Sequence, residues 1–551
     1  MASYCAIAPR GVMVPSAAKS HVHLTSQTRF FTSATRGSGR TIGGRTQRVH
    51  RFARRSTTTR NCLDDDRGGN TKSSRRAPKV SPEFNCPKLS DTLELQDVSS
   101  PFAEGGEKHG YGLGQKFVED DDCVLLNALR YEPLECETNP NAEGCDFLAG
   151  EEDEDGMAID EWKGQWAMRA GPRETIYFNP STTKAAIVTC GGLCPGLNDV
   201  IRQLVITLEE YGVEDIKGIK YGFRGFVEQK GAQREPMQLT SQIVDTIHLN
   251  GGSILGSSRG GSDVSDIVQS IKEMDLDFLF IIGGNGSHAG ALAIDNLCRQ
   301  EKLKTAIVGI PKTIDNDILL LDRTFGFQTA VDEAIKAIRS GAIEARSAKN
   351  GIGLVRLMGR QSGFIATHAA LASGEVDVCL IPEIDTPLEG NGGVLAHVRR
   401  VLKKKEHCVI VVAEGAGQDI LGALGETDAS GNPVLQNFGK HLKKELSDKL
   451  ADLEPDVKYI DPTYMVRARH TNASDAIYCS ILGQNAVHAA FAGLTGVTVG
   501  LCNGHYVYLP IPPLIKRARE VDPNGRMWER LRLAINQPVY RTVDGAETKA
   551  R

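Results

Sequence analysis

Long hydrophobic runs are missing from this sequence, and so are the cysteine patterns of small disulfide-rich or zinc-binding domains. No apolar run in the 551 residues approaches the roughly 18 residues that a membrane-spanning helix requires. The 13 cysteines include no Cys-x-x-Cys pair and no Cys/His metal set. The net charge of −5 gives no electrostatic reason to expect a nucleic-acid partner. With 40% hydrophobic and 24% charged residues, the chain has the composition of a globular protein of two or three domains.

Acidic residues are absent from the first 60 positions, where ten arginines lie in a Ser/Thr/Gly-rich stretch. That composition is typical of an organelle transit peptide, which we assign to residues 1–63, and a disordered basic tail is the alternative. Residues 64–173 form an acidic N-terminal extension that we expect to pack on or tether to the core with little regular structure. Cys136 and Cys145 lie in this extension and are a candidate redox pair, whereas Cys298, Cys379, Cys408 and Cys479 have the apolar contexts of small core residues.

Glycine-rich or charged motifs follow six short apolar segments of the kind that form buried strands. The segment–motif pairs are 185–188 with 190–198, 278–282 with 283–287, 306–308 with 309–317, 352–355 with 358–360, 378–381 with 382–383, and 409–412 with 413–415. Residues 198–210, 264–274 and 329–347 have apolar side chains at helical spacing. Strands that alternate with helices predict an α/β fold with a mostly parallel sheet, and the motifs at the carboxyl ends of the strands predict one site.

The densest of these motifs contains two carboxylates, Asp315 and Asp317, beside Thr313 and Asn316. An isolated motif of this kind is more often a solvated turn. Because it follows a buried strand and is accompanied by five similar motifs, we interpret it as a site for proton abstraction beside a metal ion or a phosphate.

Together with residues 251–260 and 464–467, these motifs resemble those of 6-phosphofructokinase, in its plant-type ATP-dependent branch. The resemblance covers residues 174–514 or so. It implies two Rossmann-like lobes with mostly parallel sheets flanked by helices, in a catalytic region at 174–515 that a polar tail at 516–551 follows. It also implies an allosteric glycolytic kinase that uses Mg²⁺ and ATP to phosphorylate fructose 6-phosphate, built as a homo-oligomer, often a tetramer, with pockets completed across subunits. A plant-type enzyme favours the plastid over the mitochondrion.

The donor site that the resemblance implies is a glycine-rich phosphate cradle. Its residues are Gly191, Arg259, Gly260, Gly283, Gly284, Asn285, Gly286 and Ser287. Glycine permits the close backbone approach that phosphates need. The family usually has Asp as a Mg²⁺ ligand at the position of Asn285, so the metal could instead depend on Asp315, Asp317, water and ATP. Gly286 is the small residue associated with ATP, whereas Lys312 is associated with pyrophosphate.

For the acceptor sugar, the resemblance makes Asp315 the proton acceptor, with Thr313 and Asp317 as further catalytic residues. The implied substrate pocket comprises Thr313, Ile314, Asp315, Met358, Gly359, Arg360, Glu414, Lys458, Tyr464, Met465, Val466 and Arg467. Arginine suits bidentate phosphate contacts, and glutamate suits sugar hydroxyls. A pyrophosphate-dependent phosphofructokinase and a non-catalytic regulatory subunit are the alternatives.

Overall fold

The computed structural model describes residues 79–109, 116–126, 165–227, 235–260, 263–422, 425–427 and 434–541. The transit peptide expected at 1–63 and the cysteines Cys136 and Cys145 lie outside these residues. The part of the chain that is described contains a two-stranded sheet, formed by β1 (Val98–Ser99) and β4 (Thr175–Ile176), and two longer sheets, which we call the larger and the smaller sheet.

The larger sheet has nine strands, in the order β2-β3-β15-β14-β9-β8-β5-β6-β7. The strands are β2 Cys123–Leu125, β3 Trp166–Arg169, β5 Lys184–Thr189, β6 Asp215–Ile219, β7 Met237–Gln238, β8 Phe278–Gly283, β9 Ala306–Pro311, β14 Val497–Cys502 and β15 His505–Pro510. Neighbours are parallel from β14 to β6, and the strands added at either side pair antiparallel. The parallel centre is the expected arrangement, and the antiparallel edges extend it.

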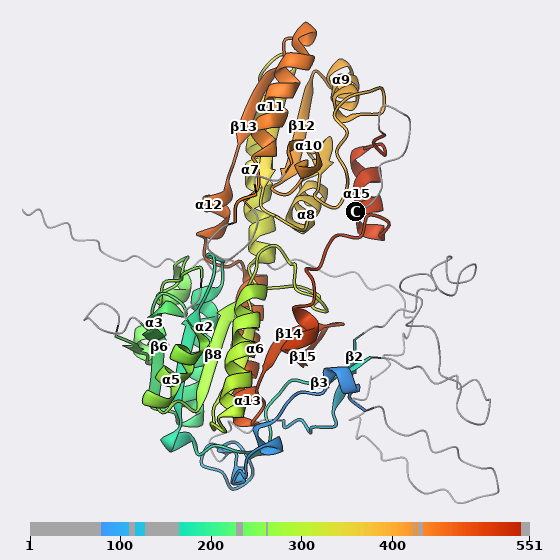
Figure 1. The fold of residues 1–551 in the computed structure, drawn as a ribbon. Coiled ribbons are helices and arrows are strands. Elements are labelled where there is room, and N and C mark those ends of the chain that lie inside the picture. Colours follow the sequence, from blue (N-terminus) through green and yellow to red (C-terminus); the bar gives the residue numbers. More distant parts are fainter. Residues whose placement is uncertain are drawn as a thin grey trace, which may run out of the picture. The chain divides into compact units, whose positions relative to one another are not determined.

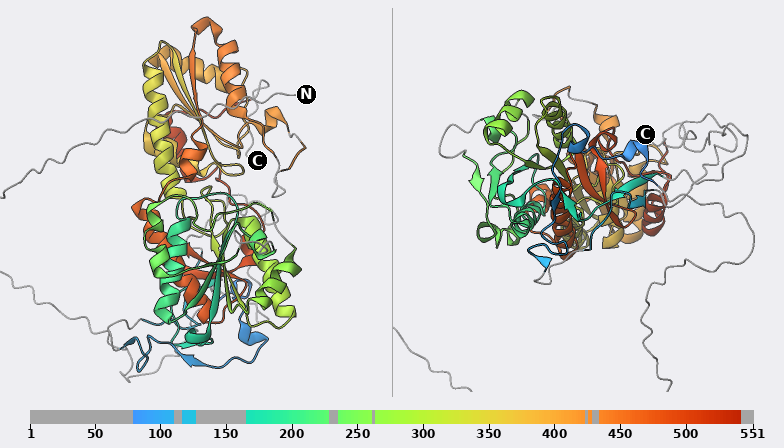
Figure 2. Two further views of the ribbon diagram at one scale, coloured as in Figure 1. Left: turned by 90° about the vertical axis from the view of Figure 1, so that its left-hand side faces the viewer. Right: turned by 90° about the horizontal axis from the view of Figure 1, so that it is seen from below.

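Helices cover both faces of the larger sheet (Figures 1 and 2). Helices α2 (Leu197–Tyr211) and α13 (Ala473–Phe491) pack on one face, and α5 (Val264–Glu273) and α6 (Asn285–Gln300) pack on the other. The side chains of β8 alternate between the two cores, with Phe280 on the α2 side and Leu279 on the α5 side. A strand buried on both faces must be apolar throughout, which is why its sequence is a continuous hydrophobic run.

The smaller sheet has four parallel strands, in the order β11-β12-β10-β13. They are β10 Gly351–Leu357, β11 Val378–Leu380, β12 His407–Ala413 and β13 Asp456–Ile460. Helices α7 (Phe327–Arg346) and α8 (Phe364–Ser373) cover one face, and α9 (Val394–Lys405) and α11 (Phe438–Lys449) cover the other. The prediction of two α/β lobes with helix-flanked parallel sheets is therefore confirmed.

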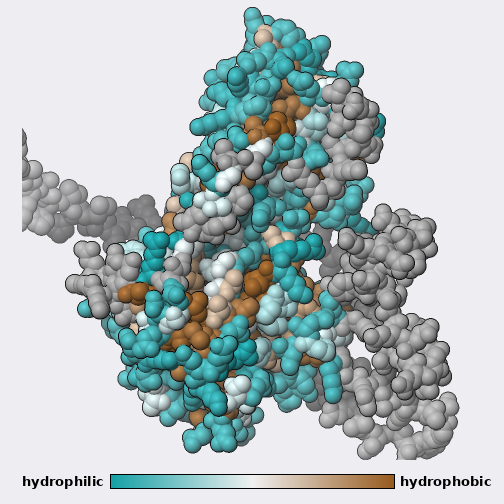
Figure 3. All heavy atoms as spheres, in the orientation of Figure 1, coloured by the Kyte–Doolittle hydropathy of each residue, from teal (hydrophilic) through white to brown (hydrophobic). Residues whose placement is uncertain are grey.

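Short elements complete the fold. They are η1 Pro82–Phe84, η2 Leu89–Asp91, β1 Val98–Ser99, β4 Thr175–Ile176, η5 Pro180–Thr182, α3 Arg224–Val227, α4 Ser241–Val244, η6 Ile247–Leu249, α10 Gln418–Leu421, η7 Ala451–Leu453, α12 Thr463–Arg467 and α14 Ile511–Leu514. Hydrophilic residues make up most of the face drawn in Figure 3, where hydrophobic residues form separate patches. Among the described helices, none combines the length and hydrophobicity needed to cross a membrane.

Two regions are more ordered than the sequence predicts. The acidic extension was expected to pack on or tether to the core with little regular structure. It does pack on the core and its described elements have at most four residues, yet its strands β2 and β3 join the larger sheet through β15. Its residues Phe84, Leu89 and Phe102 are buried in the core. The sequence did not reveal these two strands, because strands of three or four residues are too short to give a clear alternation of polar and apolar side chains.

The expected polar tail at 516–551 is also wrong for residues 526–541. Helix α15 (Arg526–Ile535) buries Trp528 and Leu531. Beyond it, the Gln537 side chain binds the backbone of Cys379 in both directions, accepting from its N–H at 2.7 Å and donating to its carbonyl at 3.0 Å. The four cysteines expected in the core, Cys379 among them, are all buried.

Candidate active site

A cavity of about 1300 Å³ lies at the carboxyl ends of strands from both sheets. The motifs that follow β5, β8, β9, β10 and β12 all line it, so the prediction that they form one site is confirmed for five of the six. The exception is the motif after β11. Glu383 is buried away from the cavity, where one carboxylate oxygen accepts hydrogen bonds from the N–H groups of Gly363 and Val521, both at 2.8 Å.

One wall of the cavity is a glycine turn beside three cationic side chains. Gly191 has φ +86°, a conformation that glycine adopts without strain, and its N–H donates to the carbonyl of Ser258. The Lys312 ammonium donates to the carbonyl of Gly192 at 2.7 Å. Burial lowers the pKa of Lys312. A Cβ atom built on Gly192 would lie 3.4 and 3.6 Å from the guanidinium groups of Arg467 and Arg259, so both cations face this turn.

The amino end of α6 lies next to this wall. The helix begins at Asn285, and no side chain caps it. Uncapped N–H groups and the helix dipole favour an anion at such an end. A Cβ atom at Gly286 would meet no atom within 4 Å, so the glycine leaves open space in the cavity lining rather than serving the packing of the helix.

The Thr313–Asp317 turn is held in place from several sides. Asn316 has φ +58°, which asparagine tolerates, and its side-chain oxygen accepts from the N–H of Thr324 at 3.0 Å. The Ser362 hydroxyl donates to the carbonyl of Asp315 at 3.0 Å, and the N–H of Arg519 donates to the carbonyl of Asp317 at 2.8 Å. Two carboxylates are thereby fixed in the cavity lining.

Burial and like charge act on these carboxylates together. Burial, with the nearby carboxylates of Asp317 and Glu414, raises the pKa of Asp315 to about 8, and burial also raises the pKa of Asp317. One side-chain oxygen of each residue, and the amide oxygen of Asn285, is buried without a hydrogen-bond partner in the described part of the chain. Oxygens of this kind suit Mg²⁺. Among the described residues, no cluster of three His, Cys, Asp or Glu side chains could hold a metal by itself.

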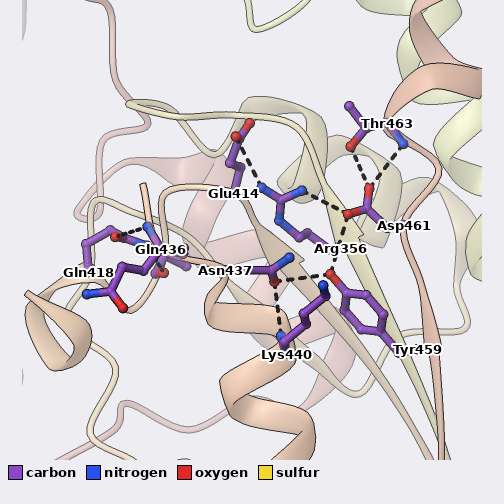
Figure 4. Close-up of polar contacts among 10 residues, drawn as sticks. Arg356, Glu414, Gln418, Gln436, Asn437, Lys440, Tyr459, Asp461 and Thr463 are labelled. Carbon is purple, nitrogen blue, oxygen red and sulfur yellow. Dashed lines mark hydrogen bonds and ion pairs between the residues drawn. The ribbon is translucent and has the colours of Figure 1, made fainter. Parts of the chain in front are cut away.

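Another part of the cavity lining contains an arginine between two carboxylates (Figure 4). Arg356, on β10, binds Glu414 at 3.1 Å and Asp461 at 3.0 Å. Asp461 also accepts from the hydroxyl of Thr463 at 2.6 Å. With 14% of its side chain exposed, Arg356 holds Glu414 in a fixed position at the edge of the cavity.

The family model for phosphofructokinase matches residues 184–490, more than half of the chain. The protein belongs to the phosphofructokinase family. Among its relatives, ATP-dependent 6-phosphofructokinase 5, chloroplastic, of Arabidopsis thaliana is 51% identical over 84% of this chain and 83% of the relative. The ATP-dependent 6-phosphofructokinase of Borreliella burgdorferi is 45% identical over 67% of this chain and 85% of the relative.

Solved structures support the phosphofructokinase fold. The pyrophosphate-dependent phosphofructokinase of Marinobacter aquaeolei superposes with a TM-score of 0.53 at 18% identity, over 67% of this chain and 97% of that one. The phosphofructokinase of Pichia pastoris gives a TM-score of 0.50 at 23% identity, over 60% of this chain and 35% of that one. At such identities the likeness concerns the fold alone.

Most of the residues that the sequence indicates for the phosphofructokinase site line the cavity. They are Gly191, Arg259, Gly260, Gly284, Asn285, Gly286, Ser287, Lys312, Thr313, Ile314, Asp315, Asp317, Met358, Arg360, Glu414, Tyr464 and Arg467. Gly283, Gly359, Met465 and Val466 are in the same motifs but outside the lining. Lys458 does not belong to the lining either, and its ammonium pairs with Asp456 at 3.0 Å.

Sequence reasoning missed Arg356 and Asp461 in the lining. A signal for Arg356 was present, because it is a charged residue near the end of a strand that is otherwise apolar, two positions before Met358. Asp461 immediately follows β13, a strand that the sequence did not reveal because its polar residues mask the apolar pattern.

Proposed function

We propose that this protein transfers the terminal phosphoryl group of ATP to the 1-hydroxyl of fructose 6-phosphate, giving fructose 1,6-bisphosphate. The observation that carries the proposal is the position of Asp315, a buried carboxylate between a glycine and arginine wall and an Arg356–Glu414 wall. The names of the relatives support it, since they are ATP-dependent 6-phosphofructokinases from plants and bacteria.

In this proposal, the donor phosphates lie against the Gly191 turn and the amino end of α6. Arg259 with Gly260 and the 283–287 turn complete the cradle, where backbone N–H groups and a guanidinium neutralise phosphate charge. Gly286 selects ATP, because the space beside it accommodates the larger donor. Lys312 contacts the same phosphates from its position beside Gly192, whose carbonyl accepts a hydrogen bond from the Lys312 ammonium.

The acceptor sugar binds beside the Arg356–Glu414 pair. Asp315 accepts the proton of the 1-hydroxyl, a role that a raised pKa suits. Thr313 orients the hydroxyl, and Glu414 binds other sugar hydroxyls while Arg356 fixes its position. Arg360 binds the 6-phosphate, and Arg467, whose guanidinium faces the Gly192 turn, binds it from the donor side. Tyr464 packs against Arg467, whose guanidinium lies 5.3 Å from the ring centroid.

Mg²⁺ is the cofactor that we propose, held by Asn285, Asp315 or Asp317 together with the phosphates. The unpartnered oxygens of these three residues are hard donors and fit that ion. When bound, the ion supplies charge neutralisation for the phosphoryl group. Asp317 is then mainly a metal ligand, and Asp315 is the proton acceptor.

The cellular context is a further part of the proposal. Chloroplastic relatives and the acid-free start of the chain support a plastid location. A homo-oligomer, most simply a tetramer, accounts for Lys458, which lies outside the cavity of its own chain but would be available to a neighbouring copy. Light scattering on the purified protein tests the oligomeric state.

A coupled assay with fructose 6-phosphate tests the proposed reaction by comparing ATP with pyrophosphate. We expect turnover with ATP and at least about ten-fold slower turnover with pyrophosphate. Gly286→Asp places a carboxylate among the donor phosphates, so kcat/KM for ATP should fall about 10- to 1000-fold, as expected for a few kcal/mol of repulsion. An unchanged thermal midpoint is the control for folding. Faster turnover with pyrophosphate would establish the first alternative, and no turnover with either donor would establish the regulatory subunit.

A further inference from the structure

A second cavity, of about 160 Å³, lies where the C-terminal segment covers the end of β11. Asp385 and Thr386, from the loop after β11, line one side of it. Asn524, Trp528 and Arg532 line the other. None of these residues belongs to the active-site cavity.

The walls of this second cavity are packed and hydrogen-bonded. Helix α15 packs against α8, beside the smaller sheet (Figure 1). Trp528 and Tyr540 are buried, and the side chain of Gln537 is paired with the backbone of Cys379. The space is therefore bordered by packed side chains and by the hydrogen-bonded segment around Gln537, so a ligand would meet a preformed site.

Arg532 gives the cavity a positive charge without a counterion. It is the one cationic side chain in the lining, and no ion pair involves it in the described part of the chain. Its Nε atom is buried and has no hydrogen-bond partner there. Asp385, the one carboxylate in the lining, has an interaction partner of its own. A half-buried guanidinium with an unused donor is stabilised by an anion.

The segment that forms this cavity also contacts the catalytic turn. The backbone N–H of Arg519 donates to the carbonyl of Asp317, and the N–H of Val521 donates to Glu383. Glu383 accepts from Gly363 as well, at the start of the helix that follows Arg360. Two residues beyond Val521, the chain enters the cavity lining at Pro523 and Asn524.

We propose that the second cavity binds a small hydroxylated organic anion and that its occupancy changes the activity at the first. A phosphate or carboxylate group pairs with Arg532, and hydroxyl groups face Thr386 and Asn524. Hydrogen bonds from residues 519–524 connect the site to the Thr313–Asp317 turn. The binding does not depend on the proposed function, whereas the effect on activity does.

Binding is tested by calorimetric titration of the full chain with glycerol 3-phosphate. Saturating fructose 6-phosphate and a non-hydrolysable ATP analogue keep the active site occupied. We expect one glycerol 3-phosphate per chain and no binding of glycerol; inorganic phosphate, tested in parallel, should bind more weakly. Arg532→Gln should weaken binding at least about 10-fold, the cost of a charged hydrogen bond. Asn524→Ala should weaken it less, and Arg530→Gln, on the exposed side of α15, should bind as the wild type does.

Two results of the titration would overturn the site: no binding under these conditions, or equal affinity in the wild type and in Arg532→Gln. Communication is then tested by steady-state kinetics with and without glycerol 3-phosphate. A change of at least about two-fold in KM for fructose 6-phosphate is expected in the wild type and in Arg530→Gln, and none in Arg532→Gln. An equal change of KM in Arg532→Gln would mean that glycerol 3-phosphate acts at the active site. That result would refute an effect of the second cavity on activity, but it would leave the binding result unchanged.

Discussion

Burial makes Asp315 a stronger base and, when it is charged, a destabilising residue. Its carboxylate lies within the cavity lining beside Asp317 and Glu414, and an oxygen of its side chain has no hydrogen-bond partner among the described residues. Both effects have one cause, since removing a carboxylate from water and placing it near like charges favours its protonated form. With Asp315 as the proposed proton acceptor, catalysis and stability are opposed at this position, and one substitution tests both.

Asp315→Asn keeps the size of the side chain and removes its basicity. We expect kcat to fall roughly 10²- to 10⁴-fold with a smaller change in KM, because a general base acts in the transition state. The measurement is steady-state turnover of fructose 6-phosphate at saturating ATP and Mg²⁺. Near-normal kcat would mean that another group accepts the proton.

The same variant should respond differently to pH. Asp315 has a pKa of about 8 in the folded chain, whereas an ordinary aspartate has a pKa of about 3.9 in the unfolded chain. Between these values the folded state holds a proton that the unfolded state has lost, so wild-type stability falls as pH rises from about 4 to about 8. The raised pKa of Asp317 acts in the same direction.

Thermal unfolding without nucleotide and with a chelator measures this effect. Asp315→Asn lacks the penalty, so its midpoint should exceed that of the wild type by a margin that grows from pH 5 to pH 8.5. A margin that is constant over this range would contradict the raised pKa.

Among the elements, those with long apolar patterns were predictable and those set by tertiary contacts were not. Strand β8 and helix α2 end within a residue or two of their expected bounds, because each supplies a continuous hydrophobic stripe to a core. Motifs at the ends of parallel strands likewise predicted the site. Strands β2 and β3 are short edge strands, and α15 follows a polar stretch, so their burial depends on partners far away in the sequence. The turn after β11 carries the same strand-end signal as the others, but Glu383 binds backbone N–H groups instead of lining the cavity.

Substitution of Gln537 tests whether the C-terminal segment that binds β11 stabilises the smaller sheet. Gln537→Ala would leave the N–H and the carbonyl of Cys379 buried and unpaired. We expect the free energy of unfolding to decrease by about 2–4 kcal/mol, as for two lost buried hydrogen bonds. Chemical denaturation measures the change. Gln269→Ala, at an exposed position of α5, is the control. If both substitutions change the free energy of unfolding by the same small amount, the contact between Gln537 and β11 does not stabilise the fold.

At the scale of the whole molecule, the catalytic region needs part of the acidic extension. Strand β3 covers the edge of β15, and Phe102 packs edge-on against Tyr211 of α2 with ring centroids 5.0 Å apart. A boundary at residue 174 would expose that sheet edge and remove buried side chains, which promotes aggregation.

Two shortened chains test this dependence. A chain that begins at Lys79 keeps every described residue and should be soluble, with wild-type kcat and thermal midpoint. A chain that begins at Glu174 should be largely insoluble or unfold at a much lower temperature. Equal soluble yield and equal thermal midpoint for both chains would show that β2 and β3 are not needed for folding or stability.

The open space beside Gly286 has a consequence for how such enzymes diverge. A single base change turns a glycine codon into an aspartate codon, and a Cβ atom built here would meet no atom of its surroundings within 4 Å. Most changes of specificity in a packed site destabilise the fold, and a lineage must first accumulate stabilising mutations to tolerate them. Under the proposed function, in which Gly286 selects the donor, no such preparation is needed at this position, so ancestors of this chain could have exchanged one phosphate donor for another in one mutational step, in either direction, as the supply of donors in the cell changed.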